Sequence, residues 1–171
     1  MFERRPIHSP MERAMRSSLN SVRQESNGAI GTGGLRRMMI ALAQRNGLSA
    51  KQLGVRAGMS SSSGTFGNYL SRARTDGWIA GDRHKLNITD AGKDALGDYD
   101  PLPEGADLLV YWLGELGNSG AAKMLKAIAD AYPKAMSKEE LGEKAGLSHT
   151  SGTFGNYLSR LRTLELISGS K

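Results

Sequence analysis

The sequence predicts a mainly α-helical protein with a small β-hairpin, built from two tandem copies of one small domain. Three observations lead to this prediction. One segment occurs twice, apolar residues recur at helical spacing in both copies, and two short alternating runs flank a polar, basic tip after the first copy. The chain has 171 residues. That length accommodates two domains of fewer than about 90 residues each.

The repeated segments are Ser49–Gly81 and Ser137–Gly169. They are offset by 88 residues without a gap, and 20 of their 33 positions are identical. The unbroken string SGTFGNYLSR stands at Ser63–Arg72 and again at Ser151–Arg160. Solenoid repeats have shorter periods of roughly 20–50 residues. The pattern therefore indicates two separate copies of a domain, here called copy 1 (35–100) and copy 2 (101–171).

Each copy carries signals for three helices. Capping boxes open the second helix, Ser49 with Gln52 in copy 1 and Ser137 with Glu140 in copy 2, and a glycine follows each helix. After a tight turn the third helix is expected to begin near Ser60 or Ser148. The apolar faces of the first helices are Leu35, Met38, Met39 and Leu42, and Leu125, Ile128, Ala129 and Tyr132; those of the third are Phe66, Tyr69, Leu70 and Ala73, and Phe154, Tyr157, Leu158 and Leu161.

A β-hairpin is predicted after the third helix of copy 1. Trp78-Ile79 and the run 86–89 flank the basic tip Arg83-His84-Lys85, and a short closing helix is expected over Asp90–Leu96. Copy 2 contains at most the first strand of such a hairpin. Three helices with a tight turn, followed by a hairpin or wing, are the layout of a winged helix-turn-helix domain. The predicted fold class is therefore mainly α with a small β-wing, in two tandem winged helix-turn-helix domains.

Two further segments lie outside the repeat. Residues 1–34 are expected to form an N-terminal helical arm, with a helix over Pro10–Gln24, and a flexible linker over Ser26–Gly34. The segment Ala106–Leu116 is apolar almost all round, so it needs burial on several faces. We expect it to lie between the copies or, together with the N-terminal helix, in a homodimer interface.

Charge and composition narrow the possible functions. Basic residues number 23 and acidic residues 17, a net charge of +6, which favours a polyanionic partner. Residues 35–100 carry a net charge of +4, whereas residues 101–171 are neutral. The absence of cysteine excludes disulfides, thiolate metal sites and cysteine nucleophiles, and it is compatible with a cytoplasmic location. No apolar run approaches 18 residues, so no membrane partner is expected.

The residues of both copies resemble known winged helix-turn-helix modules. In copy 1, Gly77-Trp78-Ile79 and the string ITDAG at Ile88–Gly92 resemble the MarR and PadR type. The string SGTFGNYLSRLRTLELI at Ser151–Ile167 is similar to a tandem winged-helix module of bacterial and phage proteins, some of which carry a HerA-type ATPase domain. The resemblance covers roughly Gly34–Lys171 and implies a DNA-binding fold. The chain has no ATPase domain and no second wing, which are departures from that pattern.

No constellation of residues predicts catalysis, so we expect no enzyme activity, no cofactor and no metal site. The glycine cluster at Gly31–Gly34 follows no strand and is a weak candidate for a phosphate loop. His8, His84 and His149 lack the spacing of metal ligands.

The exposed face of each third helix is the candidate site. At 100° per residue, Thr153, Asn156 and Arg160 fall about 200–260° from Phe154, beside a strip formed by Gly152, Gly155 and Ser159. Each glycine costs a helix about 1 kcal/mol, which close approach of another surface would offset. The DNA-binding candidates are Ser61, Ser63, Thr65, Asn68, Arg72, Arg83, His84, Lys85, His149, Ser151, Thr153, Asn156 and Arg160.

These observations predict a double-stranded DNA-binding protein, and a transcriptional regulator in particular, with copy 1 as the dominant contact. The alternative is a protein-interaction adaptor or dimerisation module for a DNA-processing machine, in which copy 2 or the Ala106–Leu116 helix binds a partner. Strong salt dependence of binding would distinguish the DNA-binding protein from the protein-interaction adaptor.

Overall fold

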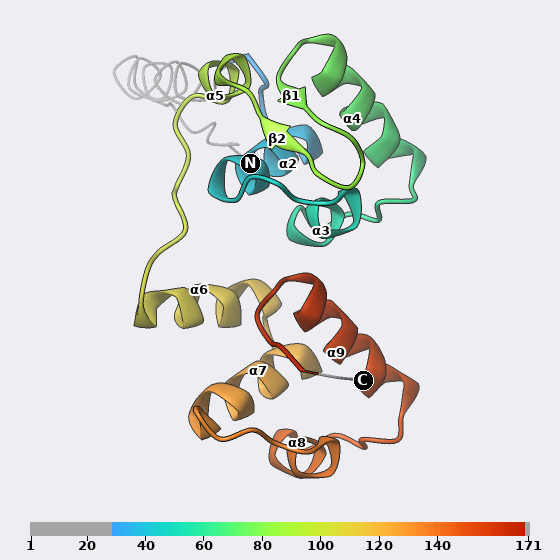
Figure 1. The fold of residues 1–171 in the computed structure, drawn as a ribbon, viewed down its shortest axis with the longest axis vertical. Helices are drawn as coiled ribbons and strands as arrows, with labels where there is room; N and C mark the ends of the chain where they lie inside the picture. Colours follow the sequence, from blue (N-terminus) through green and yellow to red (C-terminus); the bar gives the residue numbers. More distant parts are fainter. Residues whose placement is uncertain (1–28, 170–171) are drawn as a thin grey trace, which may run out of the picture.

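The computed structural model describes residues 29–169, and these residues form eight helices and one two-stranded antiparallel sheet (Figure 1). The prediction of a mainly helical protein with a small β element is thereby confirmed. The buried apolar residues form two clusters, one before residue 100 and one after it. The predicted N-terminal helix and His8 lie outside the described residues. No helix within residues 29–169 has the length and apolarity needed to cross a membrane.

Copy 1 begins with α2 (Gly34–Gln44), α3 (Ala50–Arg56) and α4 (Gly64–Thr75). The predicted apolar face of α2 is buried in full, and the capping box of Ser49 and Gln52 is present at the start of α3. The αL backbone of Gly58, with φ 66°, follows α3 as expected for a helix stop. Phe66 of α4 is fully buried in the same core. The three helices therefore pack around one apolar centre.

A short hairpin and a closing helix complete copy 1. The strands β1 (Ile79–Ala80) and β2 (Asn87–Ile88) pair antiparallel, with Ile79 opposite Ile88, and α5 (Asp90–Leu96) follows. An isolated bridge joins Leu48 to Leu86, so the segment before α3 extends the sheet by one pair. Both α5 and β2 contact α2. The hairpin is thus anchored to the core from both sides.

Copy 2 consists of α6 (Ala106–Leu116), α7 (Gly120–Ala131), α8 (Lys138–Ala145) and α9 (Gly152–Thr163). No strand follows α9 within the described residues. The helix α6 packs on α7 and contributes Trp112 and Leu116 to the core of copy 2. Its Trp112 also lies under Arg56 of copy 1. The expected burial of α6 on several faces is thus observed only in part, since Trp112 and Leu116 are its buried residues and Val110 is 68% exposed.

The first helices of the two copies correspond in a different register from the one the sequence suggested. The structure aligns Gly34 with Gly120 and Met38 with Met124, an offset of 86 residues, so copy 2 has two extra residues before its second helix. A Cβ on Gly34 would meet the ring of Tyr69, and one on Gly120 would meet the ring of Tyr157. The proposed face ending at Tyr132 is wrong, because Tyr132 follows α7 and is 83% exposed.

Two other predicted boundaries differ from the structure. The third helices begin at Gly64 and Gly152 rather than near Ser60 and Ser148, since the preceding serines are N-caps. Ile30, expected in a flexible linker, is buried, and its backbone N–H donates to the carbonyl of Ala95. Burial of the side chain in the core of copy 1 and this backbone bond fix the chain at this point.

Figure 1 shows the two copies stacked along the long axis of the molecule, with α4 and α9 on the same side and similarly oriented. The helix α3 contacts α9, which joins copy 1 to copy 2. Equivalent exposed surfaces of the two copies therefore face the same direction.

Candidate nucleic-acid interface

The exposed face of α4 combines polar side chains with a strip that has almost no side chain. Thr65 and Asn68 are exposed, and neither side chain has a hydrogen-bond partner within residues 29–169. Cβ atoms built on Gly64 and Gly67 would meet nothing within 4 Å. These glycines are therefore not required by packing inside the protein, unlike Gly54, where an added Cβ would lie 2.8 Å from the carbonyl oxygen of Met59. The face is free to receive an external surface.

Ser63 and Ser151 have a structural task at the start of these helices. The hydroxyl of Ser63 accepts a hydrogen bond from the backbone N–H of Phe66 and donates to the carbonyl of Ser60. Ser151 makes the same pair of bonds with Phe154 and Ser148. An N-cap hydroxyl satisfies a backbone donor that the helix leaves unpaired. Both serines thus define where the exposed face begins.

Arg72 is held across the end of α4. Its Nε lies 3.5 Å from the carboxylate of Asp76, and its guanidinium carbon lies 5.7 Å from the ring centroid of Trp78. The side chain is 59% exposed, so these contacts orient the guanidinium while leaving it accessible. Its counterpart Arg160 has leucines at both partner positions, 164 and 166. The repeat therefore gives its two identical arginines different surroundings.

The wing tip folds back toward the start of α4. Arg83 Nη2 donates to the carbonyl of Ser61 at 3.4 Å, and the carbonyl of Arg83 accepts from the N–H of Ala50 at 2.8 Å. The Asp82 carboxylate accepts from the backbone N–H groups of His84 and Lys85, which holds the pKa of Asp82 below its ordinary value. The basic tip is therefore an ordered turn beside the helix.

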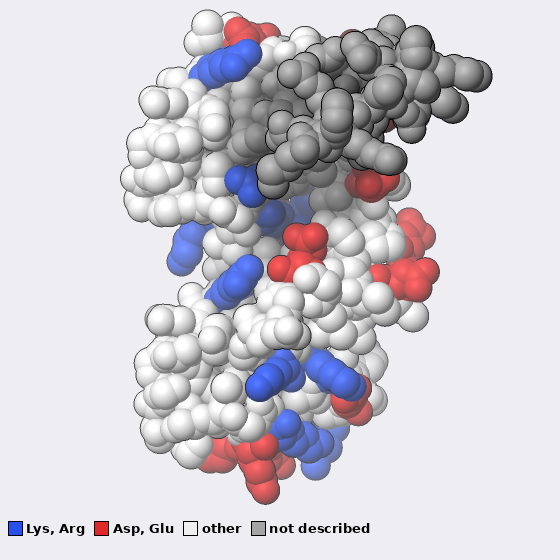
Figure 2. All heavy atoms as spheres, turned by 180° about the vertical axis from the view of Figure 1, so that it is seen from behind, with Lys and Arg blue, Asp and Glu red and all other residues white. Residues whose placement is uncertain are grey.

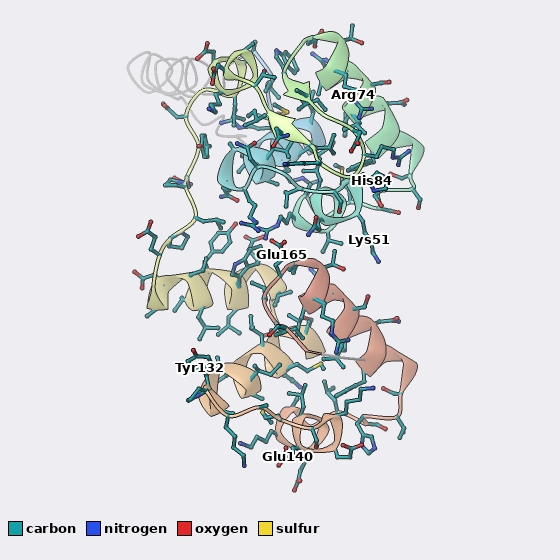
Figure 3. The ribbon with its side chains drawn as sticks, in the orientation of Figure 1. Lys51, Arg74, His84, Tyr132, Glu140 and Glu165 are labelled. Carbon is teal, nitrogen blue, oxygen red and sulfur yellow. The ribbon has the colours of Figure 1, made fainter. Side chains whose placement is uncertain are left out.

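Sequence reasoning missed one basic residue beside this tip. Lys51 is exposed on the first turn of α3, directly after Ala50, which bonds the tip. Figure 3 shows Lys51 and His84 on the side of copy 1 that carries α4. Backbone hydrogen bonds between the segment before α3 and the hairpin bring these positions together, although they are 33 residues apart in sequence.

Copy 2 presents a similar helix face in a less basic setting. Thr153 and Asn156 are exposed on α9, and Cβ atoms on Gly152 and Gly155 would again meet nothing within 4 Å. His149 lies in the preceding turn, with Nε2 3.9 Å from the Glu139 carboxylate. That carboxylate has a lowered pKa, chiefly because of a backbone hydrogen bond at its own residue. The acid beside His149 weakens the local attraction for a polyanion.

Glu165 is one of the residues that join copy 2 to copy 1, and Figure 3 places it at their junction. Its carboxylate lies 2.8 Å from Arg45 Nε, 3.2 Å from Gln52 Nε2 and 3.8 Å from Arg56 Nη2, all in copy 1. Glu165 has φ 62°, the αL conformation that its repeat counterpart Gly77 adopts without strain. A non-glycine residue in this strained position ties copy 2 to copy 1.

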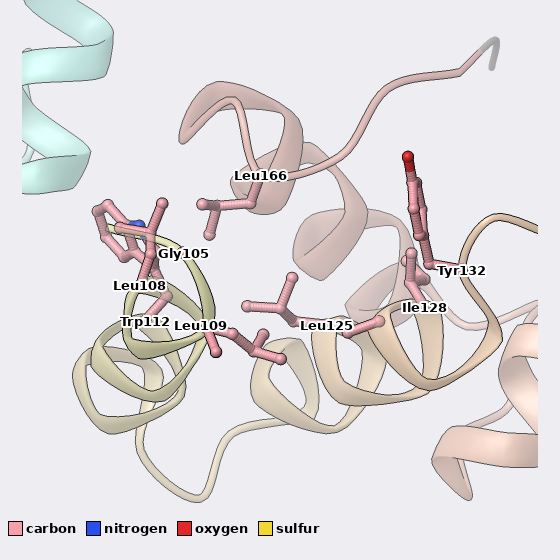
Figure 4. Close-up of a pocket in the computed structure, with 10 residues that line it drawn as sticks. Gly105, Leu108, Leu109, Trp112, Leu125, Ile128, Tyr132 and Leu166 are labelled. Atoms are coloured by element: carbon pink, nitrogen blue, oxygen red, sulfur yellow. The ribbon is translucent and has the colours of Figure 1, made fainter. Parts of the chain in front are cut away.

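A large apolar groove opens on copy 2 between α6 and α7 (Figure 4). Its volume is about 710 Å³, and its lining includes Leu109, Trp112, Ile128 and Leu166. In copy 1 the corresponding helix α2 contacts β2 and α5, and no such strand follows α9 in the described part of copy 2. The groove is therefore open where copy 1 is covered. Val110, which lies on α6, is 68% exposed.

The geometry defines a class: a tandem, mainly helical protein that presents two equivalent, glycine-bearing helix faces on one side, one of them beside a basic hairpin tip. No protein-family model, curated protein sequence or solved structure matches this chain. The function must therefore be argued from the two faces themselves.

Proposed function

We propose that this chain is a double-stranded DNA-binding protein with two winged helix-turn-helix units, whose helices α4 and α9 enter the major groove. The observation that carries the proposal is the exposed face of α4. Among residues 29–169, Thr65 and Asn68 have no side-chain partner, and Cβ atoms on the adjacent Gly64 and Gly67 would meet nothing within 4 Å. A recognition helix needs such a face, because base edges and phosphates approach its backbone closely.

Each candidate residue has a role that follows from its chemistry. The Asn68 amide pairs with the N6 and N7 atoms of adenine, and the Arg72 guanidinium pairs with O6 and N7 of guanine. Arg83 and Lys85, at the ordered wing tip, contact phosphates and set the register of the protein on the duplex. Copy 2 contributes Asn156, but its electrostatic attraction for DNA is weaker, because residues 101–171 have no net charge.

The fixed junction supports reading of two sites by one chain. Major-groove half-sites on one face of the duplex are about 34 Å apart, and α4 and α9 face the same way, so we propose that each helix enters one half-site. Sequence-specific binding of this kind is the activity of a transcriptional regulator, which is the biological role we propose.

The test starts with selection of bound sequences from random duplex DNA. Asn68→Ala is expected to cost about 1–3 kcal/mol on the selected site and little on random DNA. Lys85→Ala is expected to weaken all sequences alike and to lower the salt slope by about one unit. Asn156→Ala is the matched variant in copy 2 and should cost less than Asn68→Ala. Equal loss on selected and random DNA for Asn68→Ala refutes base reading.

The groove on copy 2 favours a second candidate function, which is association with a protein partner. Apolar surface of this extent, with Val110 exposed nearby, is typical of an association site. We propose a homodimer through α6 as its first form. Light scattering at tens of micromolar should show a dimer that Leu109→Asp converts to a monomer, while Ala80→Asp, at an exposed position on β1, should leave the dimer intact. If the wild-type protein is a monomer at that concentration, the homodimer proposal is wrong. DNA binding that does not depend on salt concentration would favour the adaptor.

A further inference from the structure

Another pocket lies where the two copies meet, and one of its lining residues, Arg160, also belongs to the candidate face of α9. Its volume is about 150 Å³, and residues of both copies line it. Copy 1 contributes Arg37 from α2 and Arg56 from α3. Copy 2 contributes Trp112 and Glu115 from α6 and Arg160 from α9. Three arginines and one glutamate therefore line one small pocket.

Arg56 forms the buried part of this pocket. Its side chain is 7% exposed, its Nη2 donates to the carbonyl of Leu164 at 3.0 Å, and its guanidinium lies 5.2 Å from the ring centroid of Trp112. Its Nε–H is buried and has no acceptor among residues 29–169. Burial also lowers the pKa of Arg56, and Glu165 acts in the opposite direction. A buried donor without an acceptor is unfavourable, so the chain itself leaves part of the Arg56 guanidinium unsatisfied.

The positive charge of the pocket is only partly neutralised within the chain. Glu165 lies 2.8 Å from Arg45 and 3.8 Å from Arg56, so it binds mainly the former. Arg37 and Arg160 are exposed, and neither guanidinium has an acceptor in the described structure. Figure 2, seen from behind, shows both Lys or Arg and Asp or Glu side chains where the copies meet. An anion entering the pocket would meet an excess of cationic groups.

We propose that this junction pocket binds a phosphate-type oxyanion, held by Arg37, Arg56 and Arg160. The planar guanidinium matches the oxygens of such a group through two parallel hydrogen bonds. A pocket of about 150 Å³ is small, which suits a single phosphate group rather than a larger ligand. The bound anion links α2 and α3 of copy 1 to α9 of copy 2. It therefore holds the two helix faces in one relative orientation.

The phosphate group could belong to the DNA backbone or to a small phosphorylated molecule, and its chemistry in the pocket is the same. Binding of the free anion does not depend on the proposed DNA-binding function. The two proposals can therefore fail separately.

The test uses Trp112 as a reporter inside the pocket. In full-length Trp78→Phe protein, Trp112 is the remaining tryptophan. Inorganic phosphate, titrated against chloride at constant ionic strength, should change its fluorescence saturably and raise the unfolding temperature. The double variant Arg37→Gln, Arg160→Gln should weaken phosphate binding at least tenfold. Glu115→Gln should strengthen it, because a carboxylate that repels the anion is removed.

Matched controls come from the repeat. Lys123 occupies on α7 the position that Arg37 occupies on α2, and Arg72 is the counterpart of Arg160. Lys123→Gln and Arg72→Gln should leave phosphate binding unchanged. The proposal is overturned if phosphate changes neither the fluorescence nor the unfolding temperature, or if the control variants lose binding as much as the pocket variants do.

DNA titrations then identify the source of the phosphate. If the DNA backbone supplies it, Arg37→Gln weakens binding to every duplex and reduces the salt slope by about one unit, and inorganic phosphate competes with DNA. If a free anion supplies it, Arg37→Gln loses phosphate binding but keeps DNA affinity. If the chain does not bind DNA at all, the phosphate titration still decides whether the pocket is an anion site.

Discussion

Replacement of Gly67 separates the stability of α4 from its proposed function. A Cβ built on this residue meets nothing within 4 Å, and the residue lies in the second turn of the helix. Helix propensity alone therefore decides the effect of Gly67→Ala on folding, and alanine is favoured by about 1 kcal/mol. If the copies unfold together, the melting temperature should rise by about 2–4 °C, and by about 4–8 °C if copy 1 unfolds alone.

Gly54 provides the matched control on the neighbouring helix. Its added Cβ would lie 2.8 Å from the carbonyl oxygen of Met59 and 3.0 Å from the backbone N of Ser61. Both are backbone atoms that cannot rotate away, so Gly54→Ala should destabilise the protein by about 1–3 kcal/mol. Thermal unfolding followed by circular dichroism measures both variants. Two glycines in one small domain should thus respond to the same substitution with opposite signs.

The binding assay completes the experiment. Gly67→Leu should fold as well as the wild type, because open space surrounds the site, yet it should abolish binding to the selected duplex, because the side chain occupies the surface that DNA must approach. Normal DNA binding by folded Gly67→Leu would refute the close-approach argument. A lower melting temperature for Gly67→Ala would refute the description of that surface as open.

Three other predictions follow from local contacts. Ser63→Ala removes the N-cap of α4 and should lower the free energy of unfolding by about 1 kcal/mol, measured by chemical denaturation. Ser151→Ala, at the repeat position on α9, should have the same effect. No loss of stability in either variant would contradict the capping role. The Glu165→Gly variant should be more stable than the Glu165→Ala variant by about 1 kcal/mol. Both variants lose the contacts with copy 1, but only alanine keeps the backbone strain at φ 62°. Equal stabilities of the two variants would argue against that strain. The wing-tip bonds to Asp82 should persist above pH ~3.9, the ordinary pKa of aspartate, and be lost as the pH falls through the lowered pKa of the folded state. Amide shifts of His84 and Lys85 measure this, and a midpoint at or above the ordinary value would contradict it.

The sequence by itself determined the local elements of this protein. Capping boxes at Ser49 and Ser137 begin α3 and α8, and the predicted closing helix matches α5 at both ends. Side-chain caps and glycine stops act within a few residues, so a single sequence contains them in full. The exposed face of α4 could be predicted for the same reason, because helical periodicity alone separates Phe66 from Thr65 and Asn68.

Tertiary structure decided the register of the first helices and the surroundings of repeated residues. The apolar spacing of α7 admits two registers, and only the packing of Gly120 against Tyr157 selects one. Arg72 and Arg160 stand in identical strings, yet one lies beside Trp78 and the other lines the junction pocket. The contacts of Glu165 with Arg45 and Gln52 join residues more than 110 positions apart. Such contacts depend on how whole domains pack, and no local pattern encodes that arrangement.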